Sequence, residues 1–241
     1  GMPAAVSALF TFNDMNQVQT IQRYIIDAYK DDMIKYASNH DQPLIKECFE
    51  SIPAQLAREN KKFTYSIIRN NARASQYQGS LQWIEDAGII RRCYNLSITE
   101  LPLDGNAIKE SFKAYMADIG LLVSMLEEGT AWSIMQGNML GYKGAIFENL
   151  VADILGKMGR KLYYFKKNSG LEIDFVIRHK GECCPLECKA STGNTKSLKT
   201  ILKHPEHYHV THAIKLGDYN IGKSNSILTL PLYMAFMLTE Y

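Results

Sequence analysis

The chain has 241 residues and is 46% hydrophobic, which is enough for a core in one large domain or two small ones. Its longest apolar stretch, Leu230–Leu238, contains Pro231 and is far shorter than the roughly 20 residues of a membrane span, so we expect no membrane partner. The net charge of +2 hides basic segments at residues 54–95 (net +4) and 141–215 (net +6), which suit either a phosphate backbone or an ordinary solvated surface.

Cysteine usage indicates a reducing compartment. The five cysteines include the adjacent pair Cys183-Cys184, which is a poor basis for a disulfide framework. No charged segment precedes an apolar stretch at the start, as it would in a signal peptide. We therefore expect reduced thiols and a cytoplasmic protein.

The first half of the chain reads as helical. Residues 16–37 predict a helix, because Val18, Ile21 and Ile25 recur on one face. Residues 51–100 predict three short helices and a strand pair. Ser51-Ile52-Pro53 is expected to open one of these helices and Gly88 to end another. Residues 101–104 then form a linker, and residues 107–136 are expected to be helical again.

A winged-helix-like pattern follows from this part of the sequence. Ile89–Cys93 and Leu96–Thr99 predict a small wing at about residues 88–100, with Ser75–Ala87 as the recognition helix. Basic residues that flank this helix are candidates for contacts with nucleic acid: Arg69, Arg73, Arg91 and Arg92. The alternative is a structural spacer, since the helix itself offers few basic side chains.

The second half contains a candidate reaction centre. Residues 170–177 and 186–189 predict two strands, and a hairpin would bring Asp174, Glu187 and Lys189 to one spot. Two carboxylates there could hold Mg²⁺ or Mn²⁺, and the lysine could act on a bound water or on the transition state. The alternative is an exposed hairpin with a surface salt bridge.

A third carboxylate joins this pattern. Residues 144–158 carry an apolar stripe with helical spacing, and Glu148 lies at its border, where it could face the edge of a sheet or simply solvent. A helix near 194–203, with Lys196 and Lys199 as further candidates for nucleic-acid contacts, and a strand over His209–Leu216 complete an αβββαβ order. This order, with Glu148, Asp174 and Glu187-x-Lys189, resembles the PD-(D/E)xK (restriction-endonuclease-like) superfamily, although Ile173 replaces the usual proline.

Further motifs resemble a domain of unknown function that follows AAA-type ATPase domains in prokaryotic proteins. They are spread along the chain in order: Tyr65–Ile68, Ser80–Ile84, Lys113–Leu122, Gly170–Phe175 and Leu186–Lys189. The resemblance implies an ATPase module upstream of residue 1 as the partner, although Gly1 could equally come from an expression vector. It also implies two regions, a helical, winged-helix-like residues 1–140 and a nuclease-like residues 141–241 with a mixed central sheet.

Two other patterns are interpreted as accidental. Gly217–Ser224 matches the P-loop pattern G-x-x-x-x-G-K-[ST], but the residues after Lys223 read as a strand cut by Pro231, whereas a P-loop needs a helix there. We expect an exposed loop and no bound nucleotide. The histidines at 204, 207, 209 and 212 match no closed zinc motif, and Pro205 would break a helix that aligned them.

The sequence thus predicts a mixed α+β protein with two alternatives for its function. The first is metal-dependent hydrolysis of nucleic acid, with Glu148, Asp174 and Glu187 as metal ligands, Lys189 as a catalytic residue and DNA as a possible partner. The second is a non-catalytic module that binds DNA or protein for the ATPase domain.

Overall fold

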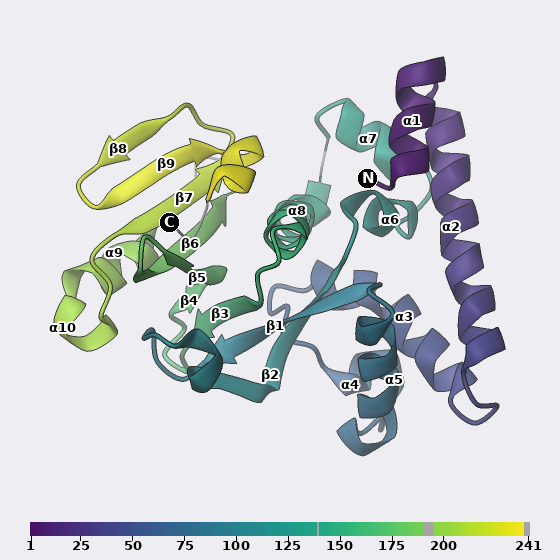
Figure 1. Ribbon diagram of the computed structural model, residues 1–241, viewed down its shortest axis with the longest axis horizontal. Coiled ribbons are helices and arrows are strands. Elements are labelled where there is room, and N and C mark those ends of the chain that lie inside the picture. Colours follow the sequence, from purple (N-terminus) through teal and green to yellow (C-terminus); the bar gives the residue numbers. More distant parts are fainter. Residues whose placement is uncertain (139, 190–194, 239–241) are drawn as a thin grey trace. The chain divides into compact units, whose positions relative to one another are not determined.

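The chain divides into two compact units, and the computed structural model describes residues 1–138, 140–189 and 195–238 (Figure 1). The first unit is Gly1–Arg91 with Ala114–Tyr142, and the second is Arg92–Lys113 with Lys143–Tyr241. The first unit is largely helical and the second contains mixed sheets, so the predicted α+β class is confirmed.

Helices build the first unit. They are α1 (Pro3–Phe12), α2 (Met15–Tyr36), α3 (Gln42–Ala57), α4 (Tyr65–Ile68), α5 (Ala74–Asp86), α6 (Ile119–Ser124), α7 (Thr130–Met135) and the 3₁₀ turn η2 (Leu140–Tyr142). α2 confirms the helix predicted over residues 16–37, and it begins where the Asp14 carboxylate accepts the Asn16 N–H at 2.8 Å. α5 confirms the helix predicted over Ser75–Ala87, and Gly88 follows it with a φ of +72°.

Two predictions for this half were wrong. Ser51–Pro53 does not open a helix but lies inside α3, where a buried stripe that includes Phe49, Ile52 and Leu56 outweighs the local proline signal. Residues 107–116 are not helical but form strand β2 (Ala107–Met116). Its end, residues 112–116, is buried without a break and is ambiguous by periodicity alone, so pairing within a sheet decides the outcome.

The predicted wing is also absent from its expected position. Ile90–Leu96 is a single strand, β1, and residues 97–99 do not continue as a second strand. β1 lies between β2 and β3 (Leu162–Lys166), and its pairing with β3 is parallel. Residues 96–99 were expected to pair with residues 89–93. Instead, β1 pairs with β2, and its second partner, β3, comes about 70 residues later along the chain.

The second unit follows the predicted order of helix, strands, helix and strand, but four strands rather than three lie between the two helices, and another short helix precedes the last strand of this order. Its further elements are α8 (Lys143–Lys157), β4 (Glu172–Ile173), β5 (Phe175–His179), β6 (Glu182–Lys189), α9 (Lys196–Lys203), α10 (Pro205–Tyr208), β7 (Ala213–Gly217), β8 (Gly222–Ser224), β9 (Ile227–Pro231) and the 3₁₀ helices η1 (Leu103–Asn106) and η3 (Leu232–Met237). β7 begins at Ala213 rather than at His209, and Asn194, the expected start of α9, lies outside the described residues.

Two sheets form the framework of the site. Their strand orders are β2-β1-β3-β4 and β5-β6-β7-β9-β8. β4 and β5 are separated only by Asp174, so one stretch of chain pairs with β3 on one side of this residue and with β6 on the other. Both pairings are antiparallel, whereas β6, β7 and β9 run parallel, which makes the second sheet mixed.

The two faces of the larger sheet carry different side chains. Val176, Cys183 and Ala213 share one face, and they form an apolar cluster with Leu198 and Ile201 of α9. Because side chains alternate, Leu186, Cys188 and Leu216 point to the opposite face, and α8 packs against β6. Glu187 and Lys189 therefore belong to the face that α9 covers.

The predictions about cysteines and membrane spans can also be compared with the fold. All five cysteines are free and buried, as expected for reduced thiols. Among the described residues, no helix has the length and apolar character that crossing a membrane requires.

Candidate functional site

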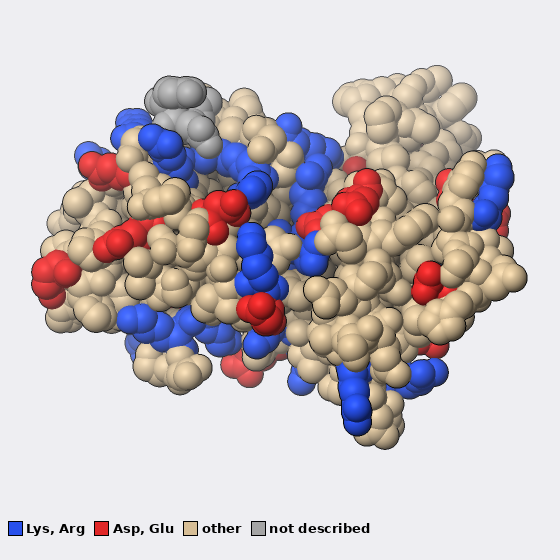
Figure 2. Space-filling view, turned by 60° about the horizontal axis from the view of Figure 1, so that its bottom comes forward, with Lys and Arg blue, Asp and Glu red and all other residues tan. Residues whose placement is uncertain are grey.

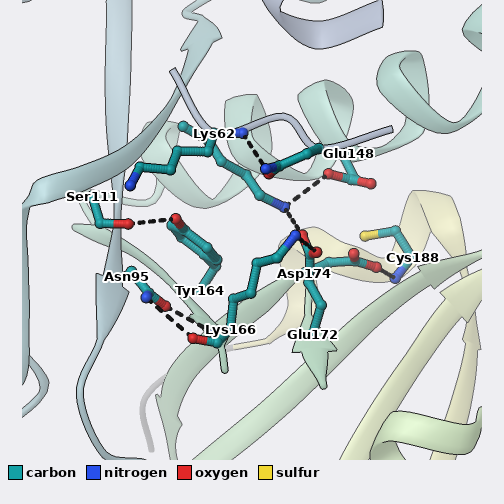
Figure 3. Close-up of polar contacts among 11 residues, drawn as sticks. Lys62, Asn95, Ser111, Glu148, Tyr164, Lys166, Glu172, Asp174 and Cys188 are labelled. Atoms are coloured by element: carbon teal, nitrogen blue, oxygen red, sulfur yellow. Dashed lines mark hydrogen bonds and ion pairs between the residues drawn. The ribbon is translucent and has the colours of Figure 1, made fainter. Parts of the chain in front are cut away.

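Asp174 occupies the break between β4 and β5. Continuing the pairing of Phe175 with Leu186 by one residue would place Asp174 opposite Glu187, but the chain bends at Asp174 and the ladder ends. Its carboxylate instead accepts the backbone N–H of Cys188 at 2.8 Å (Figure 3). The side chain thus replaces a backbone carbonyl as the partner of this amide.

A lysine that sequence reasoning missed lies at the centre of the neighbouring carboxylates. The side chain of Lys113, from β2, is 1% exposed, and its Nζ lies 2.9 Å from Glu172 Oε1 and 3.6 Å from Glu148 Oε2. Glu172 also pairs with Lys166 at 2.6 Å. Figure 3 shows Glu148 of α8 together with Glu172 and Asp174, and we call Lys113, Glu148, Glu172 and Asp174 the Lys113 cluster.

Burial and charge act against each other in this cluster. Burial lowers the pKa of Lys113, but the carboxylates of Glu148, Glu172 and Asp174 outweigh it and raise the pKa far above its usual value. Burial and the charge of Glu148 raise the pKa of Asp174 to about 7, against the opposing effects of Lys113, the Cys188 N–H and Lys189. Lys113 is therefore a permanent cation, whereas Asp174 titrates near neutral pH.

Glu172 behaves differently from Asp174. Burial would raise its pKa, but the charges of Lys113 and Lys166 and the hydrogen bonds from both lysines hold the pKa below the usual value. Glu172 is thus the ionised partner that fixes Lys113 in place. Its position two residues before Asp174 was visible in the sequence, whereas Lys113 lay in a segment predicted as helix.

Glu187 and Lys189 form a separate pair. Lys189 Nζ lies 3.2 Å from Glu187 Oε2, and the glutamate side chain is 3% exposed. Burial raises the pKa of Glu187, although Lys189, the Leu198 N–H of α9 and Lys215 pull it down. Burial lowers the pKa of Lys189, but the charges of Glu187 and Asp174 raise it overall. Lys189 thus lies within the electrostatic reach of both Glu187 and Asp174.

The predicted metal ligands lie in two different settings. Within residues 1–138, 140–189 and 195–238, no three His, Cys, Asp or Glu side chains are grouped so that they could hold an ion. Glu148 and Asp174 gather around the ammonium of Lys113, and the pair of Glu187 and Lys189 lies on the face that α9 covers. A cation from the chain itself occupies the position where carboxylates converge.

The basic residues suggested for nucleic acid lie in different settings. Arg69 reaches Glu47 at 4.0 Å, and the backbone N–H of Arg73 is bound by Gln76 at the start of α5. The Arg92 guanidinium lies 5.7 Å from the ring centres of Tyr94 and Phe112. Arg91 is half-buried on β1, and Lys196 and Lys199 are exposed on α9. On the face in Figure 2, Lys and Arg side chains gather in patches among acidic ones.

The two patterns interpreted as accidental have structural explanations. No helix begins at Lys223, which lies in β8 opposite Leu228 of β9, so only residues 218–221 form the predicted loop. The Cβ of any larger residue at Gly217 would lie 2.5 Å from the ring of Tyr219 and 2.6 Å from the Lys189 carbonyl oxygen. His204, His209 and His212 face single carboxylates at 3.4, 2.7 and 3.2 Å.

Comparison with known families gives two matches. A model of a domain of unknown function, DUF8612, matches residues 1–131, and a model of another, DUF4143, matches residues 143–233. DUF4143 is associated with AAA ATPase proteins, in agreement with the resemblance in the sequence, but the match gives no evidence of a PD-(D/E)xK core. Neither a curated protein nor a solved structure matches the chain.

Proposed function

This chain belongs to the DUF8612 family of domains of unknown function, and because it also carries a DUF4143 segment we propose that it is a non-catalytic interaction module of an AAA-type ATPase protein. The observation that carries the proposal is the buried ammonium of Lys113 between Glu172 and Glu148. Lys113 already pairs with Glu148, one of the three carboxylates that a nuclease would give to its metal.

The energetics favour a lysine that stays in this place. Removing one partner from a buried ion pair costs about 3–5 kcal/mol, because the remaining charge has no compensation. A divalent ion bound by Glu148 would have to displace Lys113 from this glutamate. This displacement opposes metal binding.

The alternative is metal-dependent phosphodiester hydrolysis, and one observation favours it. Lys189 is close enough to Asp174 and Glu187 to affect the pKa of each, which is the combination of side chains that the sequence suggested. The two functions make opposite predictions for metal binding, which can be measured directly.

The test is a calorimetric titration of the chain with MnCl₂, together with cleavage assays on plasmid DNA and single-stranded RNA. We expect no saturable Mn²⁺ binding and no cleavage, both for the chain alone and joined to an AAA-type ATPase module with ATP. Stoichiometric Mn²⁺ binding that Asp174→Asn abolishes, with cleavage that Lys189→Met slows at unchanged metal affinity, would overturn the proposal in favour of the nuclease. A contaminating nuclease would be unaffected by both substitutions.

A further inference from the structure

A second charged region of the same unit has the opposite character from the Lys113 cluster. A cleft of about 460 Å³ lies between α9, β7 and the hairpin of β8 and β9, and we call it the α9 cleft. Three lysines line it, Lys199 and Lys203 from α9 and Lys215 from β7. No carboxylate lies among its lining residues within the part of the chain that the structure describes.

The three lysines are available to a ligand. Lys199 and Lys203 are four residues apart, so they project from the same face of α9, and both are exposed. Lys215 Nζ lies 4.0 Å from the ring centre of Tyr219, which orients the ammonium. None of the three forms an ion pair with an acidic side chain of the described residues.

The neighbouring acid is already paired. Glu187 lies beside Lys215 in the register of β6 and β7, but its carboxylate has Lys189 at 3.2 Å. Lys189 therefore offsets the charge of Glu187, and the positive charge of Lys215 is left for the cleft. The two glutamates of the Lys113 cluster are likewise paired with Lys113.

Hydroxyl groups complete the lining. Ser224 and Ser226 flank Asn225 in the turn between β8 and β9, where Asn225 has a φ of +51°, and Thr229 follows on β9. Hydroxyls and lysine ammoniums are the side-chain donors that contact phosphate oxygens in nucleic-acid complexes. Lysines from two separate segments suit a ligand with several negative charges better than a single small anion.

From these observations we propose that the α9 cleft binds the phosphodiester backbone of nucleic acid. The sequence pointed to Lys199 for such a role, and the geometry adds Lys203 and Lys215. The inference goes beyond the proposed module function because it names a ligand class and a site, and it does not depend on whether the Lys113 cluster holds a metal. Each lysine is expected to neutralise about one phosphate, without reading the base sequence.

The test measures fluorescence anisotropy of a labelled single-stranded oligonucleotide and of its duplex over a series of salt concentrations. In the triple variant Lys199→Ala, Lys203→Ala, Lys215→Ala, we expect affinity to fall at least about tenfold. The slope of log affinity against log salt should fall by about two to three, since each lost phosphate contact removes about 0.7–0.9. The double variant Lys199→Ala, Lys203→Ala, which changes only exposed side chains, should lose part of both.

A matched control removes the same charge elsewhere. Lys109, Lys157 and Lys161 are exposed lysines paired with Asp104 or Asp153, and replacing all three by alanine should leave binding unchanged. Equal weakening by the two triple variants, or no binding by the wild-type chain, would overturn the proposal.

Competition distinguishes the source of the phosphate. Inorganic phosphate, AMP and poly-glutamate should compete with the oligonucleotide only weakly at equal charge concentration. Competition by phosphate or AMP as strong as that of unlabelled oligonucleotide would mean that the cleft takes a small phosphate ester. Equal competition by poly-glutamate would mean that any acidic polymer suffices, and either result would overturn the assignment to nucleic acid.

Discussion

The Lys113 cluster and the α9 cleft both contain lysines, but the surroundings of these lysines differ. In the cluster, Lys113 is 1% exposed and lies between carboxylates, so the charges satisfy one another. In the cleft, Lys199 and Lys203 are exposed and the lining residues include no carboxylate among those the structure describes. Charge that is buried and balanced holds a structure together, whereas charge that is exposed and of one sign recruits a ligand.

The strongest way to break this comparison is Lys113→Met. The substitution removes the cation from the buried Glu148 and leaves Glu172 with Lys166 alone, so we expect a loss of about 3–5 kcal/mol in the free energy of unfolding, measured by urea denaturation. Lys109→Met on the same strand is the matched control, because Lys109 is exposed and its pair with Asp104 spans 3.4 Å. The control should lose less than about 1 kcal/mol. Equal losses would show that Lys113 is not the centre of a closed cluster.

A smaller effect is expected at the cleft. Gly217→Ala places a Cβ 2.5 Å from the Tyr219 ring and 2.6 Å from a backbone oxygen, so we expect destabilisation by about 1–3 kcal/mol in thermal and urea unfolding. Displacement of Tyr219 should also release Lys215 and weaken oligonucleotide binding. Gly222→Ala is the control, since no atom lies within 4 Å of its added Cβ. A stable Gly217→Ala variant with unchanged affinity would contradict this account of Lys215.

A further test concerns pH and sharpens the description of the cluster. The pKa of Asp174 is about 7 in the folded chain and ordinarily 3.8, so the folded state holds a proton that the unfolded state has lost between these values. The contribution of Asp174 to stability is therefore full below about pH 4 and is lost as pH rises through about 7, with a slope of at most about 1.4 kcal/mol per pH unit.

Asp174→Asn should flatten the stability curve between about pH 4 and pH 7, while its amide oxygen still accepts the Cys188 N–H. Asp104→Asn is the control. The hydrogen bonds of Lys161 and Tyr163 hold the pKa of Asp104 below its usual value, so its titration lies outside this range. An unchanged slope in the Asp174→Asn variant, measured by urea denaturation at each pH, would show that Asp174 is ionised throughout.

The elements of the second unit could be predicted because local patterns specify them. The stripe of residues 144–158, the alternation around Asp174 and the segment ending at Lys189 all became the expected helix and strands. The strand at 107–116 was missed because its buried end fits a helix or a strand equally well, and its pairing with β1 decides the outcome. Periodicity in a short apolar run does not show such pairing.

The same limit explains the site. The sequence placed Glu148 on a helix and Glu187 and Lys189 on a strand, as observed, but it could not show that Asp174 lies between two strands, ends the ladder and binds the Cys188 amide. Nor could it show that Lys113, on a strand predicted as helix, lies among the carboxylates. Residue types near a site follow from short spacings, whereas the charge that balances them depends on long-range sheet order.

Gly217 explains how a chain can carry a well-known signature by coincidence. The first glycine of the nucleotide-binding pattern is needed here because an aromatic ring folds back over it, and the lysine and serine of the pattern extend a hairpin by pairing with Leu228 and Ile227. In a P-loop the glycine, the lysine and the serine all contribute to binding one nucleotide. Here Gly217 is required by packing, and Lys223 and Ser224 by strand pairing. A search that scores residue identity alone would count this segment as a nucleotide site. The lack of space for a Cβ at Gly217 shows instead that the glycine is required by packing at the end of β7.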